Sequence, residues 1–577
     1  MSKFRKYTFE DIEIPEAMMT GRLAHVSPLA LKILYKRGYQ SREALEDALF
    51  GKLNQTLFMT EMQGTKDALP LLADAIKNKT QIVVYQDYDV DGCAAGAVCL
   101  ETIRALGGDI QCYVNDREVD GYGIRKHGID RIGQLYPAAK VILTVDNGIT
   151  AHDEVTYAKE KGYTIIVTDH HSPGNTLPEA DAVIDPKRED EFYPFRELCG
   201  TAVAFKLMLA LYQYLERDTA PVLNTIDLVG FATVADIVPL IGENRDFVRE
   251  ALRMMNNGTR PAFQMMKEMS GVNEINAQRT IAYIFAPMVN ALSRMGEDPY
   301  IATNMLISQD DTFLRKSVEF MMKINNERKQ QTDDQARIAK EILMQEMENI
   351  YGRQTEAEFL QNLPPAIVIK SDEFTEGIIG IVAGRLKNEF YRPIVVLAPS
   401  GDGILKASCR SIDGFHLKNN LDKLSDLLMV YGGHAKAAGL SISEENLIEF
   451  KQRFLALAKT IDEEKRKEIV ELDAVLTMAQ ATIKQIQDLR ILEPYGEAFP
   501  PPIFGLKFSY DAVRYMGAED VHVKYWNRQH NLSVIEWHGG EAERKRAAQK
   551  KRRTKVIGTL SINEYQGNLS PQFIIEN

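Results

Sequence analysis

The stretch VVYQDYDVDGCAAG, residues 83–96, carries three aspartates at alternate positions directly after an apolar run. The apolar run has the composition of a buried strand, and the small residues that follow it suit the start of a helix. Asp87, Asp89 and Asp91 are therefore expected at a strand end, where like charges repel one another. A divalent cation would neutralise them, so the stretch is a candidate metal site.

Strand-like and helix-like patterns alternate over the next 150 residues, and the strand-like runs are continuously apolar. This alternation predicts a parallel sheet covered by helices on both faces. Ligands bind such sheets at the carboxyl ends of the strands. Asp146 ends the run VILTVD, and Asp169 with His170 ends the run IIVTDH. Asp236 lies in GFATVADIVPL, where a helix-like pattern gives way to a strand-like one.

Carboxylate and imidazole ligands suit Mn²⁺ or Mg²⁺ better than metals that prefer thiolates. Several carboxylates leave room for two ions bridged by one aspartate, and two ions about 3.5–4 Å apart are the usual arrangement for attack of water on a phosphodiester. Each strand end alone is more typical of a solvated turn or helix cap than of a ligand set. Their combination in one α/β unit predicts a metal-dependent phosphoesterase.

Length and composition limit the class of protein. A chain of 577 residues, 45% of them hydrophobic, is long enough for three or four globular domains. The five cysteines form no CxxC pair, which gives no support to a disulfide framework or a zinc site. No run of about 18 apolar residues and no signal peptide is found, so a cytoplasmic protein is expected.

The motifs DYDVDG, GYGI, VDNGIT, VTDHH, CGTAVAFKL and ATVADIVPL follow one another along residues 87–240. This series resembles the DHH phosphoesterase superfamily and, in order and wording, its RecJ family of single-strand-specific 5′ to 3′ DNA exonucleases. The resemblance covers nearly the whole chain. It implies an α/β fold with a parallel-sheet DHH domain, a smaller α/β DHH-associated domain joined to it by a long helix, and a C-terminal β-barrel of the OB type.

The expected parts of the chain are five. They are a helical lead-in (1–79), the DHH catalytic domain (80–304), a connecting helix (305–352), the DHH-associated domain (365–459) and an OB-like nucleic-acid-binding domain (460–577).

The resemblance also implies the ligands of two Mn²⁺ or Mg²⁺ ions. These ligands are Asp87, Asp89, Asp91, Asp146, His170 and Asp236. Asp146 is expected to bridge the ions, and His171 to face the scissile phosphate or to support a ligand. Asp169 is expected to orient the two histidines rather than to bind metal.

The segment FAPMVNALSRMGED, residues 285–298, is similar to a RecJ segment in which asparagine and arginine bind substrate. Asn290 and Arg294 keep this pattern, and Arg294 is expected to act in catalysis by holding a nonbridging phosphate oxygen. Met288 and Ser293 depart from it, because arginine and glycine are common at these positions of the family.

The DHH-associated domain carries a second set of substrate-binding residues by resemblance. The set comprises Ser408, Arg410, Gly432, Gly433 and His434. Glycines allow backbone amides to approach a phosphate, and arginine offers a bidentate fork, so these residues are expected to capture the 5′ phosphate of the strand. Thr375 stands where the family often has histidine.

The C-terminal segment offers aromatic and basic residues for single strands. Tyr525, Trp526 and Trp537 are candidate stacking residues, and barrel core is an equally good interpretation of each. The run RKRAAQKKRRTK, residues 544–555, holds eight cations that would attract a phosphate backbone.

We therefore expect a monomeric exonuclease that releases mononucleotides from the 5′ end of single-stranded DNA during recombination and repair, with a helicase and a single-strand-binding protein as candidate partners. Two alternatives remain open. One is a DHH phosphodiesterase acting on oligoribonucleotides or cyclic dinucleotides, and the other is a noncatalytic strand-binding replication scaffold.

Overall fold

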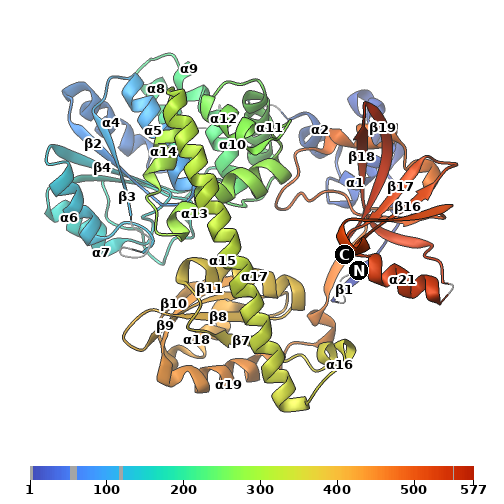
Figure 1. The fold of residues 1–577 in the computed structure, drawn as a ribbon. Coiled ribbons are helices and arrows are strands. Elements are labelled where there is room, and N and C mark those ends of the chain that lie inside the picture. The colour runs from blue at the N-terminus through green and yellow to red at the C-terminus, as the bar shows by residue number, and fades with distance from the viewer. Residues whose placement is uncertain (1–3, 52, 54–61, 116–120, 550, 577) are drawn as a thin grey trace. The chain divides into compact units, whose positions relative to one another are not determined.

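The computed structural model falls into two compact units (Figure 1). The one-sheet unit comprises residues 39–326 and 492–501, and the three-sheet unit comprises the chain up to Gly38, residues 327–491 and the chain from Pro502 onward. The residues described are 4–51, 53, 62–115, 121–549 and 551–576. No helix among them is long and apolar enough to cross a bilayer.

The one-sheet unit is built on five parallel strands in the order β3-β2-β4-β5-β6. Their bounds are β2 (Gln81–Gln86), β3 (Ile110–Val114), β4 (Ala139–Val145), β5 (Thr164–Thr168) and β6 (Ala182–Ile184). Strand β2 comes first in the chain but lies between β3 and β4 in the sheet. The direction in which successive strands are added to the sheet therefore reverses at β2. Such a reversal places a ligand site at the carboxyl ends of the strands.

Both faces of this sheet are covered, which explains why its strands are apolar at consecutive positions. Ile82 and Val84 of β2 belong to a core shared with α4 (Thr65–Asn78), α5 (Val90–Ala105) and α8 (Gly200–Tyr214). Val83 and Tyr85 point to the other face and to α6 (Lys126–Leu135) and α7 (His152–Glu160). The α/β fold with a parallel sheet expected from the sequence is confirmed.

Further helices complete the one-sheet unit. They are α2 (Arg42–Phe50), α9 (Ala220–Leu223), α10 (Ile226–Ala235), α11 (Gly242–Asn256), α12 (Pro261–Ser270), a π-helix (Ala277–Phe285), α13 (Ala286–Arg294) and α14 (Tyr300–Ile307). Asp236 caps the carboxyl end of α10, and the residues up to Gly242 form no strand. The prediction of a strand after Asp236 is therefore wrong. The side-chain amide of Asn244 donates to the Pro239 carbonyl and holds this segment as an irregular loop.

A buried arginine fixes a distant segment to the same unit. Arg245 of α11 is only 2% exposed, and its guanidinium donates to the carbonyls of Ala48, Leu492 and Pro494. The guanidinium also lies 4.0 Å from the centre of the Phe499 ring. Burial lowers the pKa of Arg245 to about 9, so even with these acceptors the protein stabilises the charged guanidinium less well than water does.

The helix α15 (Asp311–Tyr351) leads into the three-sheet unit, followed by α16 (Glu356–Gln361). A mixed five-stranded sheet comes next, in the order β10-β11-β9-β8-β7. Its elements are β7 (Ile367–Lys370), α17 (Glu376–Phe390), β8 (Ile394–Pro399), β9 (Ile404–Arg410), α18 (Leu417–Asp422), β10 (Leu428–Gly433), β11 (Ala437–Ser443) and α19 (Leu447–Ala458). The expected long helix and smaller α/β domain are both present.

The C-terminal part is a seven-stranded sheet in the order β13-β14-β18-β19-β17-β16-β15. Its elements are β13 (Ala474–Thr477), α20 (Ile483–Leu489), β14 (Phe504–Lys507), β15 (Ala512–Met516), β16 (His522–Asn527), β17 (Leu532–Glu536), α21 (Gly540–Ala548), β18 (Lys555–Tyr565) and β19 (Asn568–Ile575). The β-rich C-terminal domain expected from the sequence is confirmed.

The amino-terminal lead-in is helical in α1 (Pro28–Lys36) and α2, and it also contains a strand. Strand β1 (Arg5–Thr8) pairs in parallel with β12 (Glu468–Glu471). Arg5 supports the pairing with ion pairs to Glu468 and Glu576, at 2.5 and 2.7 Å. A partner more than 450 residues away in the chain cannot be recognised from a four-residue strand.

Candidate metal centre

The sequence DYDVDG forms the turn from β2 into α5. Asp89 caps the helix, because its Oδ1 accepts from the backbone N–H groups of Asp91 and Gly92 at 2.8 and 3.2 Å. A Cβ at Gly92 would overlap the carbonyl oxygen of Asp87, so the turn needs glycine there. The side chains of Asp87 and Asp91 are 3% and 1% exposed.

Asp146 follows β4 in the left-handed region, with φ of +62°. This conformation is costly for a residue with a side chain and is found where the surroundings enforce it. A Cβ at Gly200 would come within 2.7 Å of the Asp146 Cβ, so the glycine of the CGTAVAF motif makes room for the aspartate.

The amino end of α8 holds the Asp91 carboxylate. Backbone N–H groups of Gly200 and Thr201 donate to its two oxygens at 2.6 and 2.7 Å, and the Thr201 hydroxyl donates at 2.6 Å. A helix amino terminus favours a negative charge, because its N–H groups are unpaired and its dipole is positive. Residues about 110 positions apart are thereby fixed to each other.

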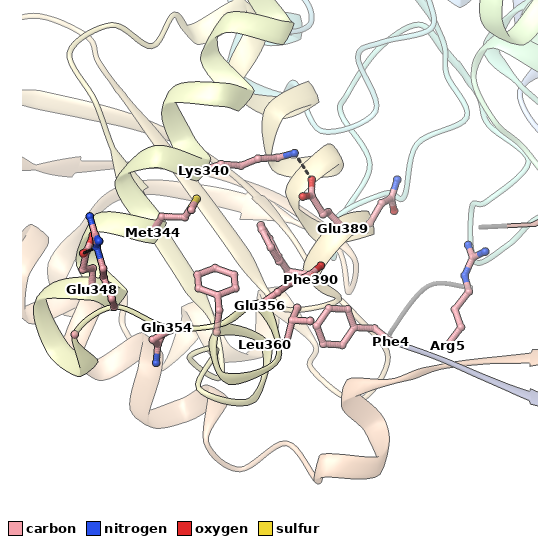
Figure 2. Close-up of a pocket in the computed structure, with 14 residues that line it drawn as sticks. Phe4, Arg5, Lys340, Met344, Glu348, Gln354, Glu356, Leu360, Glu389 and Phe390 are labelled. Carbon is pink, nitrogen blue, oxygen red and sulfur yellow. Dashed lines mark ion pairs between the residues drawn. The ribbon is translucent and has the colours of Figure 1, made fainter. Parts of the chain in front are cut away.

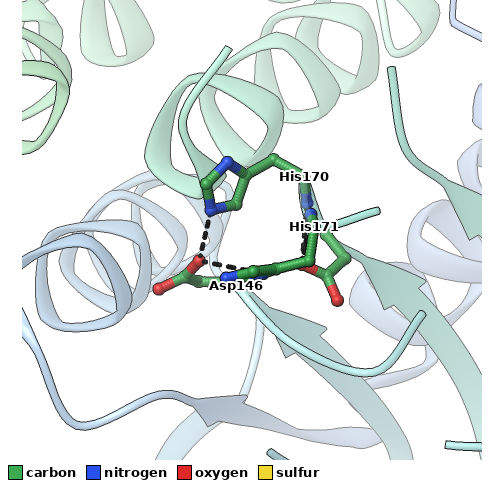
Figure 3. A group of neighbouring side chains, drawn as sticks. Asp146, His170 and His171 are labelled. Atoms are coloured by element: carbon green, nitrogen blue, oxygen red, sulfur yellow. Dashed lines mark hydrogen bonds and ion pairs between the residues drawn. The ribbon is translucent and has the colours of Figure 1, made fainter. Parts of the chain in front are cut away.

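The predicted ligands from four separate strand and helix ends come together. His170 Nε2 lies 3.0 Å from Asp146 Oδ1 (Figure 3) and 3.7 Å from carboxylate oxygens of Asp91 and of Asp236. Ligand atoms lie within 4.8 Å of one another in three overlapping groups. The groups are Asp87, Asp89 and Asp146; Asp91, His170 and Asp236; and Asp146, Asp169, His170 and His171.

The chemistry of this donor set fits divalent cations. Asp146 Oδ1 and both ring nitrogens of His170 are buried and make no hydrogen bond to any described residue. Burial lowers the pKa of His170 to about 4, which leaves a neutral imidazole with a lone pair. Burial and the neighbouring aspartates raise the pKa of Asp146 well above its usual value and that of Asp236 to about 9. A cation would lower the raised pKa values of the two aspartates and would keep His170 neutral.

Both oxygens of Asp169 accept hydrogen bonds within the site. Oδ1 accepts from the backbone N–H groups of His170 and His171 and lies 2.7 Å from His171 Nδ1, while Oδ2 accepts from the Ile149 N–H. Although burial opposes the charged form, the hydrogen bond to Asp169 raises the pKa of His171. The carboxylate therefore fixes both histidines.

Asn290 and Arg294 lie on α13, next to the aspartate turn. The Asn290 Oδ1 accepts from the backbone N–H of Val90, the first residue of α5, at 3.1 Å. Asn290 thus supports the turn in addition to any contact with substrate. Arg294 is the last residue of α13 and is half-buried. Met288 and Ser293, the two departures from the family pattern, are each only 4% exposed and pack inside the unit.

The second set of predicted substrate residues lies in the three-sheet unit. Ser408 and Arg410 are two residues apart on β9, and the Arg410 Nη1 donates to the Ser408 Oγ at 3.0 Å. Ser408 pairs with Gly439 of β11, which pairs with Gly432 of β10. Gly433 ends β10, and the N–H of His434 donates to the Ala437 carbonyl beside it. Four of the five residues therefore lie on β9 and β10, which flank β11 in the sheet, and His434 follows β10 directly.

Helix α17 packs over Ser408 and Arg410. A Cβ at Gly380 would lie 3.2 Å from the Ser408 Oγ and 3.4 Å from an Arg410 nitrogen, so the glycine allows the helix to approach these two side chains closely. Thr375, where the family often has histidine, precedes the helix and accepts from the Gln335 side-chain amide at 3.0 Å.

The C-terminal candidates divide into buried and exposed residues. Tyr525 is 1% exposed, and its hydroxyl donates to Glu536 and Glu543, so it cannot stack on a base and that expectation is wrong. Trp537 is 45% exposed and Trp526 is partly exposed.

Two cations of the basic run are engaged within the domain, since Arg546 and Arg553 pair with Glu536 at 2.9 and 2.6 Å. Lys545 pairs with Glu541 on the surface of α21. Lys550 lies outside the described residues.

Sequence reasoning missed two residues beside the centre. Asp185 follows β6 as Asp169 follows β5, and the Asp169 N–H donates to the carbonyl of Ile184. Burial and Asp169 raise the pKa of Asp185 to about 8. The rule that found the other aspartates, an acid after an apolar run, applies to ADAVID as well. Tyr122 of the GYGI motif contacts His171, which no local pattern indicates.

A cavity of about 1000 Å³ lies in the three-sheet unit (Figure 2). Its walls are partly apolar, with Phe4, Met344, Leu360 and Phe390. The lysine on its rim, Lys340, is paired with Glu389 at 2.5 Å. The cavity brings no cluster of potential catalytic groups together among the described residues.

Three family profiles match the chain. They are the DHH family N-terminal domain (residues 81–233), the DHHA1 domain (364–460) and the RecJ OB domain (472–577). The single-stranded-DNA-specific exonuclease RecJ of Salmonella typhimurium is 33% identical, over 97% of this chain and 98% of its own. RecJ of Escherichia coli is 32% identical, over 96% of each chain.

A solved structure agrees with these sequence matches. RecJ of Thermus thermophilus in complex with Mn²⁺ superposes with a TM-score of 0.81 at 27% identity, covering 100% of this chain and 80% of its own. Identity above 30% over nearly the full length of two relatives, together with the three matched domains, shows that the chain belongs to the RecJ family.

Proposed function

We propose that the protein is a metal-dependent exonuclease that degrades single-stranded DNA from its 5′ end to mononucleotides. The observation that carries this proposal is a buried set of potential metal ligands. Asp146 Oδ1 and the His170 ring nitrogens make no hydrogen bond to any described residue, and the pKa values of Asp146 and Asp236 are raised. The relatives that the chain matches along its whole length are exonucleases of this specificity.

Six residues would hold two Mn²⁺ or Mg²⁺ ions. They are Asp87, Asp89, Asp91, Asp146, His170 and Asp236. When bound, such ions supply Lewis acidity and a water of lowered pKa for attack on the phosphodiester. Asp146 belongs both to the aspartate group and to the histidine group, so it is our candidate for the shared ligand.

The remaining residues of the centre would orient the phosphate. Asp169 holds His171 with its ring directed at the centre, where it can donate to a phosphate oxygen. Arg294, at the end of α13, would pair with a nonbridging oxygen and stabilise the charge that develops during attack. Asn290 keeps the aspartate turn in place through Val90 and remains a candidate substrate contact.

The three-sheet unit would select the substrate. Ser408, Arg410, Gly432, Gly433 and His434 form our candidate site for the 5′ phosphate, with the Arg410 fork as its charged group. The proposal assigns catalysis to residues 80–304, end capture to 365–459 and strand binding to 460–577, with 305–352 as the connection after the lead-in 1–79. Trp526 and Trp537 remain candidate stacking residues.

The first test compares end-labelled 40-nucleotide substrates in Mn²⁺, Mg²⁺ and chelator. We expect a 5′-labelled single strand to release labelled mononucleotide at once, whereas a 3′-labelled strand shortens as a ladder. Duplex DNA and RNA of the same sequence are the specificity controls. Faster cleavage of dinucleotides or cyclic dinucleotides than of the 40-mer would favour the DHH phosphodiesterase, and tight DNA binding without turnover would favour the scaffold.

The proposal extends to the cell. Recombination and repair require removal of single strands, and a helicase that unwinds duplex DNA would supply them; a single-strand-binding protein would coat them. We therefore expect a monomer that acts on chromosomal DNA in the cytoplasm.

A further inference from the structure

Tyr122 is an exposed aromatic residue at the edge of the candidate metal centre. It is 40% exposed, whereas Tyr85 and Tyr113 of the adjacent strands are 0% and 6% exposed. Its ring meets the His171 ring edge to face, with centroids 5.4 Å apart and planes at 68°. His171 in turn lies against His170, at 4.4 Å between centroids.

The hydroxyl of Tyr122 points into the centre. It donates to the carbonyl oxygen of Asp146 at 3.1 Å and lies 2.9 Å from the Nδ1 of His171. Since the phenol proton is used on Asp146, its oxygen can accept from the imidazole N–H that also serves Asp169. The polar end of the side chain is thus engaged, and the ring is left facing solvent.

A buried network holds Tyr122 in this position. Gly121 and Gly123 flank it, both with φ of +76°, a conformation that favours glycine. The side-chain amide of Asn115, which is 1% exposed, donates to the carbonyls of both glycines. Asn115 itself accepts from the buried Tyr85 hydroxyl. An exposed ring fixed by internal hydrogen bonds is preorganised for contact with a ligand.

We propose that Tyr122 both positions His171 and binds substrate, with its ring stacked on the base next to the scissile phosphate. This inference rests on the proposed function. An aromatic face suits any base, because every base has a π-face, and it therefore fits an enzyme that degrades strands irrespective of sequence. The hydroxyl and the ring would have separable effects, the first on turnover and the second on recognition of the base.

The test uses Tyr122→Phe, Tyr122→Trp and Tyr122→Ala with 40-nucleotide single strands that are either intact or abasic at the first or second nucleotide. We expect wild type to prefer the intact strand by about tenfold in kcat/KM, from the loss of one stacked base. Tyr122→Ala should lose most of that preference, because the base then has no ring to contact. Tyr122→Phe and Tyr122→Trp should retain it.

The hydroxyl is tested by the kcat of the same variants. Tyr122→Phe should lower kcat several-fold on intact and abasic strands alike, with the preference between them unchanged. Full preference in Tyr122→Ala would overturn the stacking assignment, and a wild-type kcat in Tyr122→Phe would overturn the positioning of His171.

Two controls separate these outcomes from unfolding and from failure of the proposed function. Tyr283→Ala removes a tyrosine that is 73% exposed on the same unit and should leave both measurements unchanged. Mn²⁺ affinity measured by calorimetry should be the same in all variants, which excludes a collapsed centre. Wild type that fails to digest the intact strand would refute the proposed function, whereas active wild type with unaltered variants would refute only the role of Tyr122.

Discussion

Each unit of the protein contains a buried acidic cluster, and the two clusters are neutralised differently. In the C-terminal sheet, Glu536 and Glu543 are 4% and 3% exposed and pair with Arg546 and Arg553 at 2.6–2.9 Å. Among the described residues, no lysine or arginine makes an ion pair with Asp89, Asp146 or Asp236 at the candidate metal centre. The first cluster is complete within the chain, and the second requires a cation from outside.

The pKa values of the acids in the two clusters shift in opposite directions. Although burial opposes ionisation of Glu536, Arg553 and Arg546 hold its pKa below the usual value. Burial and neighbouring aspartates instead raise the pKa of Asp236 to about 9. A buried acid with its own arginine is structural, whereas a buried acid without one stores an unfavourable interaction that ligand binding can relieve.

The largest effect is expected at the candidate shared ligand. Asp146→Asn should lower Mn²⁺-dependent cleavage of single strands at least about a thousandfold, since one amide cannot replace a carboxylate between two cations. The measurement is single-turnover digestion of a 5′-labelled 40-mer. Asp153→Asn, at an exposed position of α7 in the same unit, should retain full activity. Retained cleavage in Asp146→Asn would refute the two-metal assignment.

A substitution in the glutamate–arginine cluster of the C-terminal sheet should lower the free energy of unfolding rather than the rate of cleavage. Arg553→Met leaves Glu536 short of a partner, and breaking a buried pair in this way costs about 3 kcal/mol of the free energy of unfolding. Urea denaturation measures the loss, and cleavage of a dinucleotide substrate measures the chemistry. The comparison fails if Arg553→Met is as stable as wild type.

Metal-free protein should lose stability as pH rises. The folded-state pKa of Asp236 is raised, so its contribution is fully present below the ordinary value and is lost as pH rises through about 9. Between pH 6 and 8 the slope should differ from that of Asp236→Asn by up to about 1.4 kcal/mol per pH unit. Urea denaturation in chelator tests this, and identical slopes would contradict it. Mn²⁺ should bind more tightly at higher pH, because binding displaces the proton.

The smallest effect is expected at an exposed pair near the internal cluster. Glu541 and Lys545 pair at 2.6 Å across one turn of α21, with both side chains more than 70% exposed. Glu541→Gln should leave the thermal midpoint unchanged within error, because water already solvates both charges. A shift as large as that of Arg553→Met would show that burial does not distinguish the two kinds of pair.

Local patterns in the sequence predicted the parts that depend on local chemistry. The apolar runs predicted the parallel sheet, and acids at their ends predicted Asp87 and Asp146 at one edge. The same rule applied to β6 would have included Asp185. Asp91 was predicted as a metal ligand, and its hydrogen bonds to Gly200 and Thr201 could not be foreseen, since no pattern links residues 110 positions apart.

The C-terminal residues show where composition misleads. Tyr525, Arg546 and Arg553 have the residue types of a strand-binding surface, but they satisfy one another and two glutamates inside the domain. The burial of Tyr525 depends on the register of β16 and β17, which sets it opposite Val534. Such cross-strand pairing is decided by the whole sheet rather than by the segment.

The Arg245 contacts set a practical limit on where the protein can be divided. A version that ends before Leu492 would remove two of the carbonyls and the Phe499 ring that surround this guanidinium, and a desolvated cation without acceptors is among the most damaging defects in a core. Anyone producing the one-sheet unit by itself should therefore retain the ten residues Leu492–Pro501, supplied as a linked peptide, or replace the arginine with an apolar side chain.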